Sequence, residues 1–122
     1  MSLSLKEIIA EINDFASARE WDQFHTPKNL ASSIVIEAGE LLECVQWDNP
    51  SCEELISDKD RITQIGEEIA DVLNYSLRLC SLLNLNPLEE LEKKLVKNES
   101  KYPVSSSKGT SQKYTTFERE GK

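Results

Sequence analysis

Glycine and cysteine are scarce in this sequence, and patterns typical of β-strands are nearly absent. Only four of the 122 residues are glycine, and no P-loop is present, which argues against γ-phosphate chemistry of the Walker type. The three cysteines, Cys44, Cys52 and Cys80, are odd in number and lack C-x-x-C spacing. We therefore expect reduced thiols in a cytoplasmic protein. β-Branched residues do not alternate with polar ones over a useful length, which argues against a β fold.

The sequence also contains fewer basic than acidic residues and lacks long apolar runs. Acidic residues number 22 against 14 lysines and arginines, which gives a net charge of −8. Such a surface repels nucleic-acid backbones and anionic membranes. No apolar run reaches the roughly 18 residues of a membrane span, and the N-terminal residues become charged before a signal-peptide core forms. We expect neither nucleic acid nor a membrane as a partner.

Helical patterns fill the first hundred residues. Apolar side chains recur at helical spacing over about residues 4–18, 27–46, 60–83 and 87–100. Thr26 before Pro27 and Asn86 before Pro87 are typical helix starts, and Ser51 suits the cap of a short extra helix. The prediction is an all-α fold, an antiparallel bundle of four main helices with short connections, in a domain spanning residues 1–103. Residues 104–122 are predicted to form a polar tail, extended or mobile.

Two pairs of acidic residues border the apolar faces of these helices. Glu37 and Glu40 form the first pair, and Glu68 and Asp71 form the second, each at i,i+3 spacing, whereas Glu67 points away from its helix's apolar face. Antiparallel packing of the two helices could bring both pairs together. Four convergent carboxylates repel one another unless a cation joins them. Ligand sets made only of oxygen suit Mg²⁺ or Mn²⁺.

A second interpretation of the acidic residues stays open at this point. A single i,i+3 acidic pair usually lies on a solvated helix face. The chain would then be a non-catalytic helical module for oligomerisation or regulation. That interpretation predicts no stabilisation by Mg²⁺.

Five short motifs occur in a specific order along the chain. They are W-x-x-F-H-x-P from Trp21, E-x-G-E from Glu37, Q-W from Gln46, E-E-x-x-D-x-x-x-Y from Glu67, and K-Y-P from Lys101. As a set they resemble the MazG-like all-α nucleoside triphosphate pyrophosphatases, and within them the small dCTP pyrophosphatase branch. The resemblance covers about residues 5–103.

The resemblance implies a Mg²⁺-dependent hydrolase, with Mn²⁺ as a possible substitute. Such an enzyme cleaves a nucleoside triphosphate, here dCTP or a modified dCTP, between its α- and β-phosphates to give the monophosphate and pyrophosphate. Glu37, Glu40, Glu68 and Asp71 match the family's metal-binding and catalytic acids. Another nucleotide, such as dUTP or phosphoribosyl-ATP, stays open as the substrate of the same fold.

The same resemblance implies a substrate site around the acidic residues. It places aromatic and polar side chains around the base and sugar, and a second group near the phosphates, with Asp71 shared between metal and substrate. The first group is Trp21, His25, Trp47 and Tyr75. The second is Lys94, Asn98 and Tyr102.

Apolar residues outside the main helix faces predict assembly. Val35 and Ile36 lie away from the apolar stripe of their helix, and leucines surround much of the helix over residues 60–83. A four-helix monomer has one core and no evident use for a second apolar face. The resemblance points the same way, to dimers paired into a tetramer. We expect a homo-oligomer with the site near or across a subunit boundary.

Overall fold

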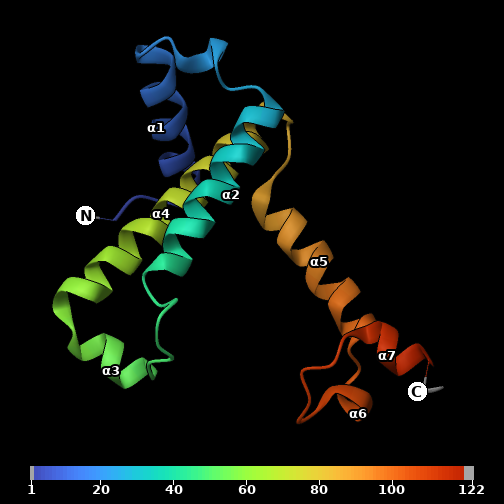
Figure 1. Ribbon diagram of the computed structural model, residues 1–122. Coiled ribbons are helices and arrows are strands. Elements are labelled where there is room, and N and C mark those ends of the chain that lie inside the picture. The colour runs from blue at the N-terminus through green and yellow to red at the C-terminus, as the bar shows by residue number, and fades with distance from the viewer. Residues whose placement is uncertain (1, 120–122) are drawn as a thin grey trace. The chain divides into compact units, whose positions relative to one another are not determined.

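The computed structural model describes residues 2–119, and every regular element in that range is a helix (Figure 1). This confirms the predicted all-α class. The chain divides into two compact units, residues 1–85 and 86–122, which are described separately below. The elements are α1 Leu5–Ala18, the 3-10 turn η1 Trp21–Gln23, α2 Pro27–Glu43, α3 Cys52–Ser57, α4 Lys59–Leu82, α5 Pro87–Lys101, α6 Val104–Ser107 and α7 Tyr114–Arg119.

Side-chain caps determine where the helices begin. The Thr26 hydroxyl accepts a hydrogen bond from the Asn29 N–H, and the Asn86 side chain accepts two at the start of α5. Ser51 caps α3 as predicted. The second helix ends earlier than expected, at Glu43, where the N–H groups of Cys44 and Val45 bond to the carbonyls of Leu41 and Leu42; the Arg61 guanidinium binds the Cys44 carbonyl at 2.9 Å. That carbonyl is then engaged outside the helix.

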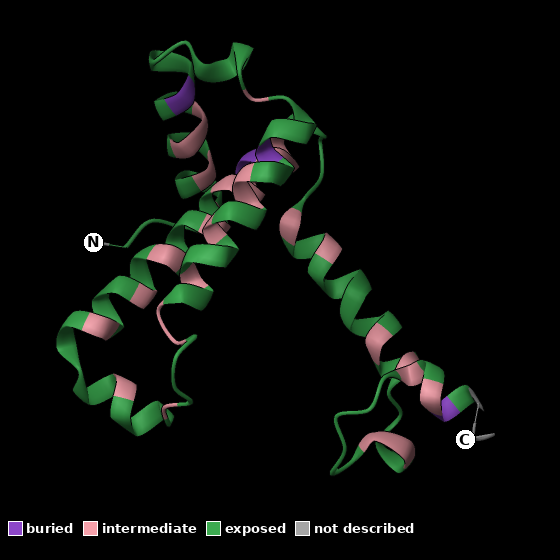
Figure 2. Cartoon of the chain, viewed as in Figure 1, coloured by how far each residue is buried: buried purple, intermediate pink, exposed green. Residues whose placement is uncertain are grey.

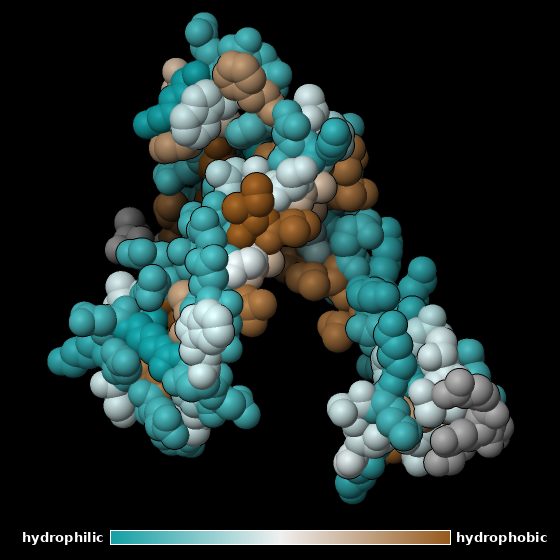
Figure 3. Space-filling model, viewed as in Figure 1, coloured by the Kyte–Doolittle hydropathy of each residue, from teal (hydrophilic) through white to brown (hydrophobic). Residues whose placement is uncertain are grey.

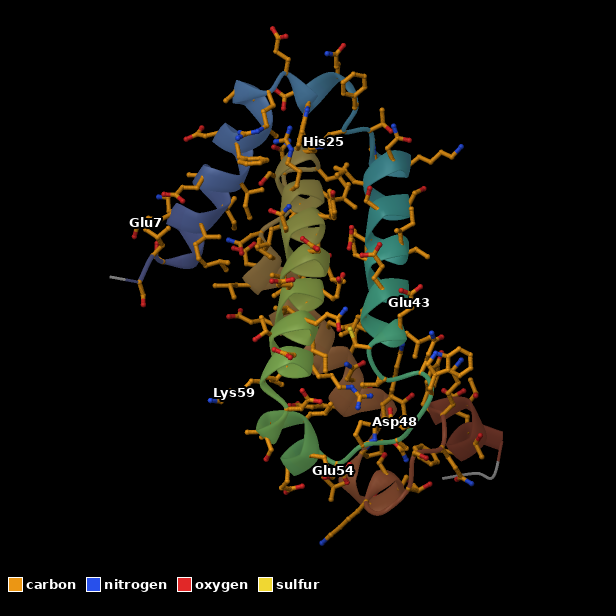
Figure 4. All side chains as sticks on the ribbon, turned by 60° about the vertical axis from the view of Figure 1, so that its left-hand side comes forward. Glu7, His25, Glu43, Asp48, Glu54 and Lys59 are labelled. Carbon is orange, nitrogen blue, oxygen red and sulfur yellow. The ribbon has the colours of Figure 1, made fainter. Side chains whose placement is uncertain are left out.

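In the first unit, α2 and α4 run side by side in opposite directions (Figure 4). Arg61, near the start of α4, reaches Cys44 after the end of α2, while Arg78, near the end of α4, reaches His25 just before α2 begins. The α1 helix packs against the same end of α4, where Asn13 donates to the Ser81 hydroxyl at 3.1 Å.

The first unit buries few side chains completely, and most residues are exposed or half-buried (Figure 2). Its fully buried side chains are Ala16, Leu30 and Arg78. The α5 helix belongs to the second unit, so its place in a four-helix bundle stays a prediction. In the described part of the chain, no helix combines the length and the apolar character needed to cross a bilayer.

The second unit contains two short helices in the segment that the sequence predicted to be an extended or mobile tail. Between residues 104 and 119 the chain forms α6 and α7; residues 120–122 lie outside the described range. The rings of Tyr114 and Phe117 each pack edge-on against Tyr102 at 6.0 Å, and Phe117 is 3% exposed. The Ser- and Lys-rich composition concealed these aromatic anchors, which bury enough apolar surface to fold the segment onto α5.

We expect Leu30→Ala to lower the free energy of unfolding by about 2–5 kcal/mol. Leu30 is 1% exposed, so the shortened side chain leaves a cavity that the surrounding helices cannot fully close. Leu42→Ala in the same helix is the matched control, because Leu42 is 59% exposed and its loss should change stability by about 1 kcal/mol or less. Denaturant unfolding at equal protein concentrations measures both; equal losses would contradict the burial of Leu30.

Candidate functional site

Carboxylates from α2 and α4 meet between the two helices. One oxygen from each of Glu37, Glu40 and Glu68 lies within 4.8 Å of the other two. Asp71, one turn further along α4, adds a fourth negative charge that acts on both Glu37 and Glu68. Three of the four predicted acids therefore form a tight cluster, with the fourth beside it. Glu67 is exposed.

The crowding of these groups changes their protonation. A proton shared with Glu40 is the largest cause that raises the pKa of Glu37 to about 7, and burial and the charges of Glu40, Asp71 and Glu68 add to it. Burial is the largest cause that raises the pKa of Glu68, followed by Glu40. Both shifts express the same fact, that several negative charges are held together without a positive partner.

The cluster fits a hard divalent cation. Glu37 Oε2 and Glu68 Oε2 are buried and have no hydrogen-bond partner among the described residues, although buried polar atoms are nearly always paired in native proteins. The ligand set contains only carboxylate oxygens, the donors that Mg²⁺ and Mn²⁺ prefer. A cation bound here would both satisfy these oxygens and cancel the repulsion.

An aromatic hollow lies beside the cluster. It has a volume of about 230 Å³, and its walls come from α1, η1 and α4. The ring of Phe15 stands edge-on to Trp21 at 5.6 Å, and Trp21 lies 6.3 Å from His25. Asp71 and Tyr75 form the side nearest the acids. The hollow is smaller than the roughly 300–1,000 Å³ of drug-sized sites, so it suits a single flat ring better than a whole nucleotide.

A buried arginine on α4, Arg78, also lines the hollow. The sequence analysis did not predict this residue. Arg78 is 6% exposed and donates to Asp22, to His25 Nδ1 at 3.1 Å and to Asn13 Oδ1 at 2.8 Å. Asp22 also accepts from the Ser17 hydroxyl at 3.1 Å. These bonds fix the connector between α1 and α2 onto the end of α4.

A second hollow, on the other side of the acids, contains another arginine that the sequence analysis missed. It has a volume of about 420 Å³ and is lined by Glu40, Glu68 and Arg61, among others. Arg61 binds both carboxylate oxygens of Asp48, at 3.0 and 2.5 Å, and this pairing lowers the pKa of Asp48. Arg61 lies seven residues before Glu68, and Arg78 lies seven residues after Asp71. Seven residues are about two helical turns, so this spacing places each arginine on the same face of α4 as one of the acids. The spacing could have identified both arginines from the sequence.

The remaining predicted substrate residues are not brought to the hollow within the first unit. Trp47 is 89% exposed, in the turn after α2, and is absent from both hollows. The other three residues, Lys94, Asn98 and Tyr102, belong to the second unit. Their roles stay predictions. Trp21, His25 and Tyr75 do line the hollow beside the acids.

The fold and the site define a class of protein: an all-α chain with an oxygen-only acidic cluster between two antiparallel helices. The MazG-like family model matches residues 32–117, and the chain belongs to the MazG-like family. This confirms the family that the sequence motifs predicted.

Named relatives lie in the predicted branch of the family. The chain is 36% identical to dCTP pyrophosphatase 1 of Mus musculus over 108 residues, which are 87% of this chain and 63% of the relative. It is 37% identical to dCTP pyrophosphatase 1 of Homo sapiens over 105 residues, 84% of this chain and 61% of the relative. The chain therefore spans less than two thirds of the length of these relatives.

A solved structure agrees with the fold. The crystal structure of a pyrophosphatase from Archaeoglobus fulgidus superposes with a TM-score of 0.75 at 45% sequence identity. The match covers 84% of this chain and 95% of that one.

We expect Mg²⁺ to stabilise the wild-type protein but not the Glu68→Gln variant. A cation at a hundred times its dissociation constant adds about 2.7 kcal/mol to the stability of the state that binds it. Glu67→Gln is the matched control, because its carboxylate is adjacent in sequence but exposed, and it should respond like the wild type. Thermal unfolding with and without Mg²⁺ measures the effect. An equal gain in the Glu68 variant would exclude this residue as a ligand.

Proposed function

We propose that the protein hydrolyses a nucleoside triphosphate, dCTP or a modified dCTP, between its α- and β-phosphates. The products are the nucleoside monophosphate and pyrophosphate. The observation that carries the proposal is the cluster of Glu37, Glu40 and Glu68 with two buried, unpaired carboxylate oxygens. The names of the relatives, dCTP pyrophosphatase 1 and pyrophosphatase, support the same chemistry.

Mg²⁺ is the cofactor of this proposal, with Mn²⁺ as a substitute. Glu37, Glu40 and Glu68 would hold it, with Asp71 beside them. The bound cation would neutralise the triphosphate, orient it and lower the pKa of the attacking water. An acidic protein with a net charge of −8 needs such a counter-charge before a polyphosphate can approach it.

The chain's own residues supply orientation and proton transfer. The aromatic walls of the hollow would stack on the base, and Tyr75 lines the hollow together with Asp71. A carboxylate oxygen of Glu37 or Glu40 that the cation does not use accepts a proton from the attacking water. The water oxygen bonds to phosphorus, the bridging P–O bond breaks, and pyrophosphate leaves with the bond's electron pair. Arg61 lines the hollow on the far side of the acids, where its charge is paired with Asp48.

The alternatives are less well supported. A non-catalytic module with solvated acids does not account for buried carboxylate oxygens without partners. A hydrolase of the same fold acting on another nucleotide, such as dUTP, would use the same acids and differ only in the hollow. A cytoplasmic location belongs to the proposal, because all three cysteines are free thiols.

We expect Asp71→Asn and Glu40→Gln to lose at least about a hundredfold in kcat while staying folded, because charge stabilisation at the reacting phosphate is a large part of such catalysis. Glu67→Gln should keep wild-type turnover. The assay measures pyrophosphate and monophosphate from dCTP, dUTP and modified nucleotides with Mg²⁺. Release of the diphosphate and inorganic phosphate instead would place cleavage at the other bond. Full activity in either acid variant would refute the site.

Assembly into a homo-oligomer, a tetramer of two dimers, is also part of the proposal. Val35 is 71% exposed and Ile36 is 59% exposed, and they line a mostly apolar hollow of about 450 Å³ on α2. Figure 3 shows a hydrophobic cluster over that helix. Apolar patches of this kind are typical of surfaces that another chain covers.

We expect light scattering at micromolar concentration to give about four times the chain mass, or at least twice.

Trp47→Ala should raise the KM for the preferred nucleotide about tenfold or more if a stacked base needs this ring, since stacking on an aromatic ring is worth roughly 1–3 kcal/mol. Because Trp47 is 89% exposed within one chain, the variant should raise the KM far more than it lowers the melting temperature. A fully active monomer would overturn both the assembly and a site shared between subunits.

A further inference from the structure

We infer that Arg78 is a positioning residue that fixes the tautomer of His25, so that the imidazole offers an Nε2–H donor to the ring bound in the aromatic hollow. The guanidinium Nε–H donates to His25 Nδ1 at 3.1 Å. Arginine is protonated at every relevant pH and has no acceptor atom. Nδ1 must therefore carry the lone pair, which leaves the proton of a neutral imidazole on Nε2.

The guanidinium cannot easily turn away to release this constraint. Its other nitrogens are bound to Asp22 and, at 2.8 Å, to Asn13 Oδ1. Asn13 in turn donates through its amide to the Ser81 hydroxyl at 3.1 Å, so its carbonyl is fixed on the side of Arg78. Only one assignment of donors and acceptors satisfies this network. Arg78 donates in all three of its bonds, and its partners on α1 and the connector accept.

The charges around His25 keep the ring neutral. Burial and the adjacent Arg78 charge lower the pKa of His25, while Asp22 opposes them. An imidazolium would carry a proton on Nδ1 and oppose it to the Nε–H of Arg78. Both the geometry and the charge therefore favour the same single form, neutral with the proton on Nε2.

The fixed tautomer determines which hydrogen-bonding group a ligand needs in order to pair with His25 in the hollow. His25 lines it, and within residues 2–119 no group hydrogen-bonds Nε2. A ring that pairs with this donor presents an acceptor to it, a carbonyl oxygen or an unprotonated ring nitrogen. The class of ligand is a nucleobase with such an edge; this last step rests on the proposed function, whereas the tautomer does not.

Nitrogen NMR of ¹⁵N-histidine protein tests the inference directly. The chain has one histidine, so its two ring signals need no assignment against others. In the free protein, without metal or nucleotide and at mildly alkaline pH, we expect a protonated Nε2 and a lone-pair Nδ1. With arginine also labelled, a scalar coupling across the hydrogen bond should join Nδ1 to the Arg78 Nε. A protonated Nδ1, or rapid averaging of the two nitrogens, would overturn the inference.

Arg78→Met supplies the complementary test. It should let the two tautomers mix and raise the KM for the preferred nucleotide roughly twofold to tenfold, with a smaller change in kcat, as loss of one neutral hydrogen bond implies. Asn13→Ala is the control, because it removes a different partner of Arg78 and should leave the tautomer unchanged. An unchanged tautomer in Arg78→Met would overturn the role of Arg78. If that variant does not fold, the coupling in the wild-type protein decides.

The two proposals fail separately in these measurements. A fixed tautomer in a protein that releases no pyrophosphate from any nucleotide would refute the proposed function and leave the role of Arg78 standing. Pyrophosphate release by a protein whose His25 nitrogens average would do the opposite.

Discussion

Repulsion among the carboxylates between α2 and α4 is the constraint on which the rest of the first unit depends. Glu37, Glu40 and Glu68 converge within 4.8 Å, and two of their buried oxygens have no partner in the described chain. Charges on both helices contribute to the raised pKa of Glu37, about 7: Glu40 on the same helix is the largest cause, followed by burial and then by Asp71 and Glu68 on α4. Something else must hold the helices in register while the acids stay together.

Two arginines on α4 provide that register, one on each side of the acids. Arg61 binds the Cys44 carbonyl and Asp48, and Arg78 binds His25 and Asp22. Arg61 binds residues just after the end of α2, and Arg78 binds residues just before its start. The helix pair is therefore fixed at both ends, and the acids lie in the middle (Figure 4). Neither arginine forms an ion pair with the clustered acids. The negative charge of these acids therefore remains available to bind a cation. A salt bridge into the cluster would have removed that charge.

The sequence predicted what depends on local pattern and could not predict what depends on partners far along the chain. Helix starts followed from caps such as Thr26 and Asn86, and the acidic pairs followed from i,i+3 spacing on amphipathic helices. The contact of Arg61 with the Cys44 carbonyl, just after α2, was missed because the two residues are seventeen positions apart in the sequence. Likewise, the folding of residues 104–119 depends on Tyr114 and Phe117 packing against Tyr102, a contact that composition does not reveal.

The small buried core and the position of Trp47 outside the aromatic hollow have one physical explanation if the protein assembles as proposed. A chain that leaves Val35, Ile36 and Trp47 more than half exposed has not buried the apolar surface that a domain of this size usually buries. In the same chain Trp21 and His25 line the aromatic hollow, whereas Trp47 does not. If the missing apolar cover and the missing aromatic wall both come from other copies, folding and substrate binding depend on the same association. The acids would then need to be rigid within each chain, because they are the one part of the site that assembly does not complete.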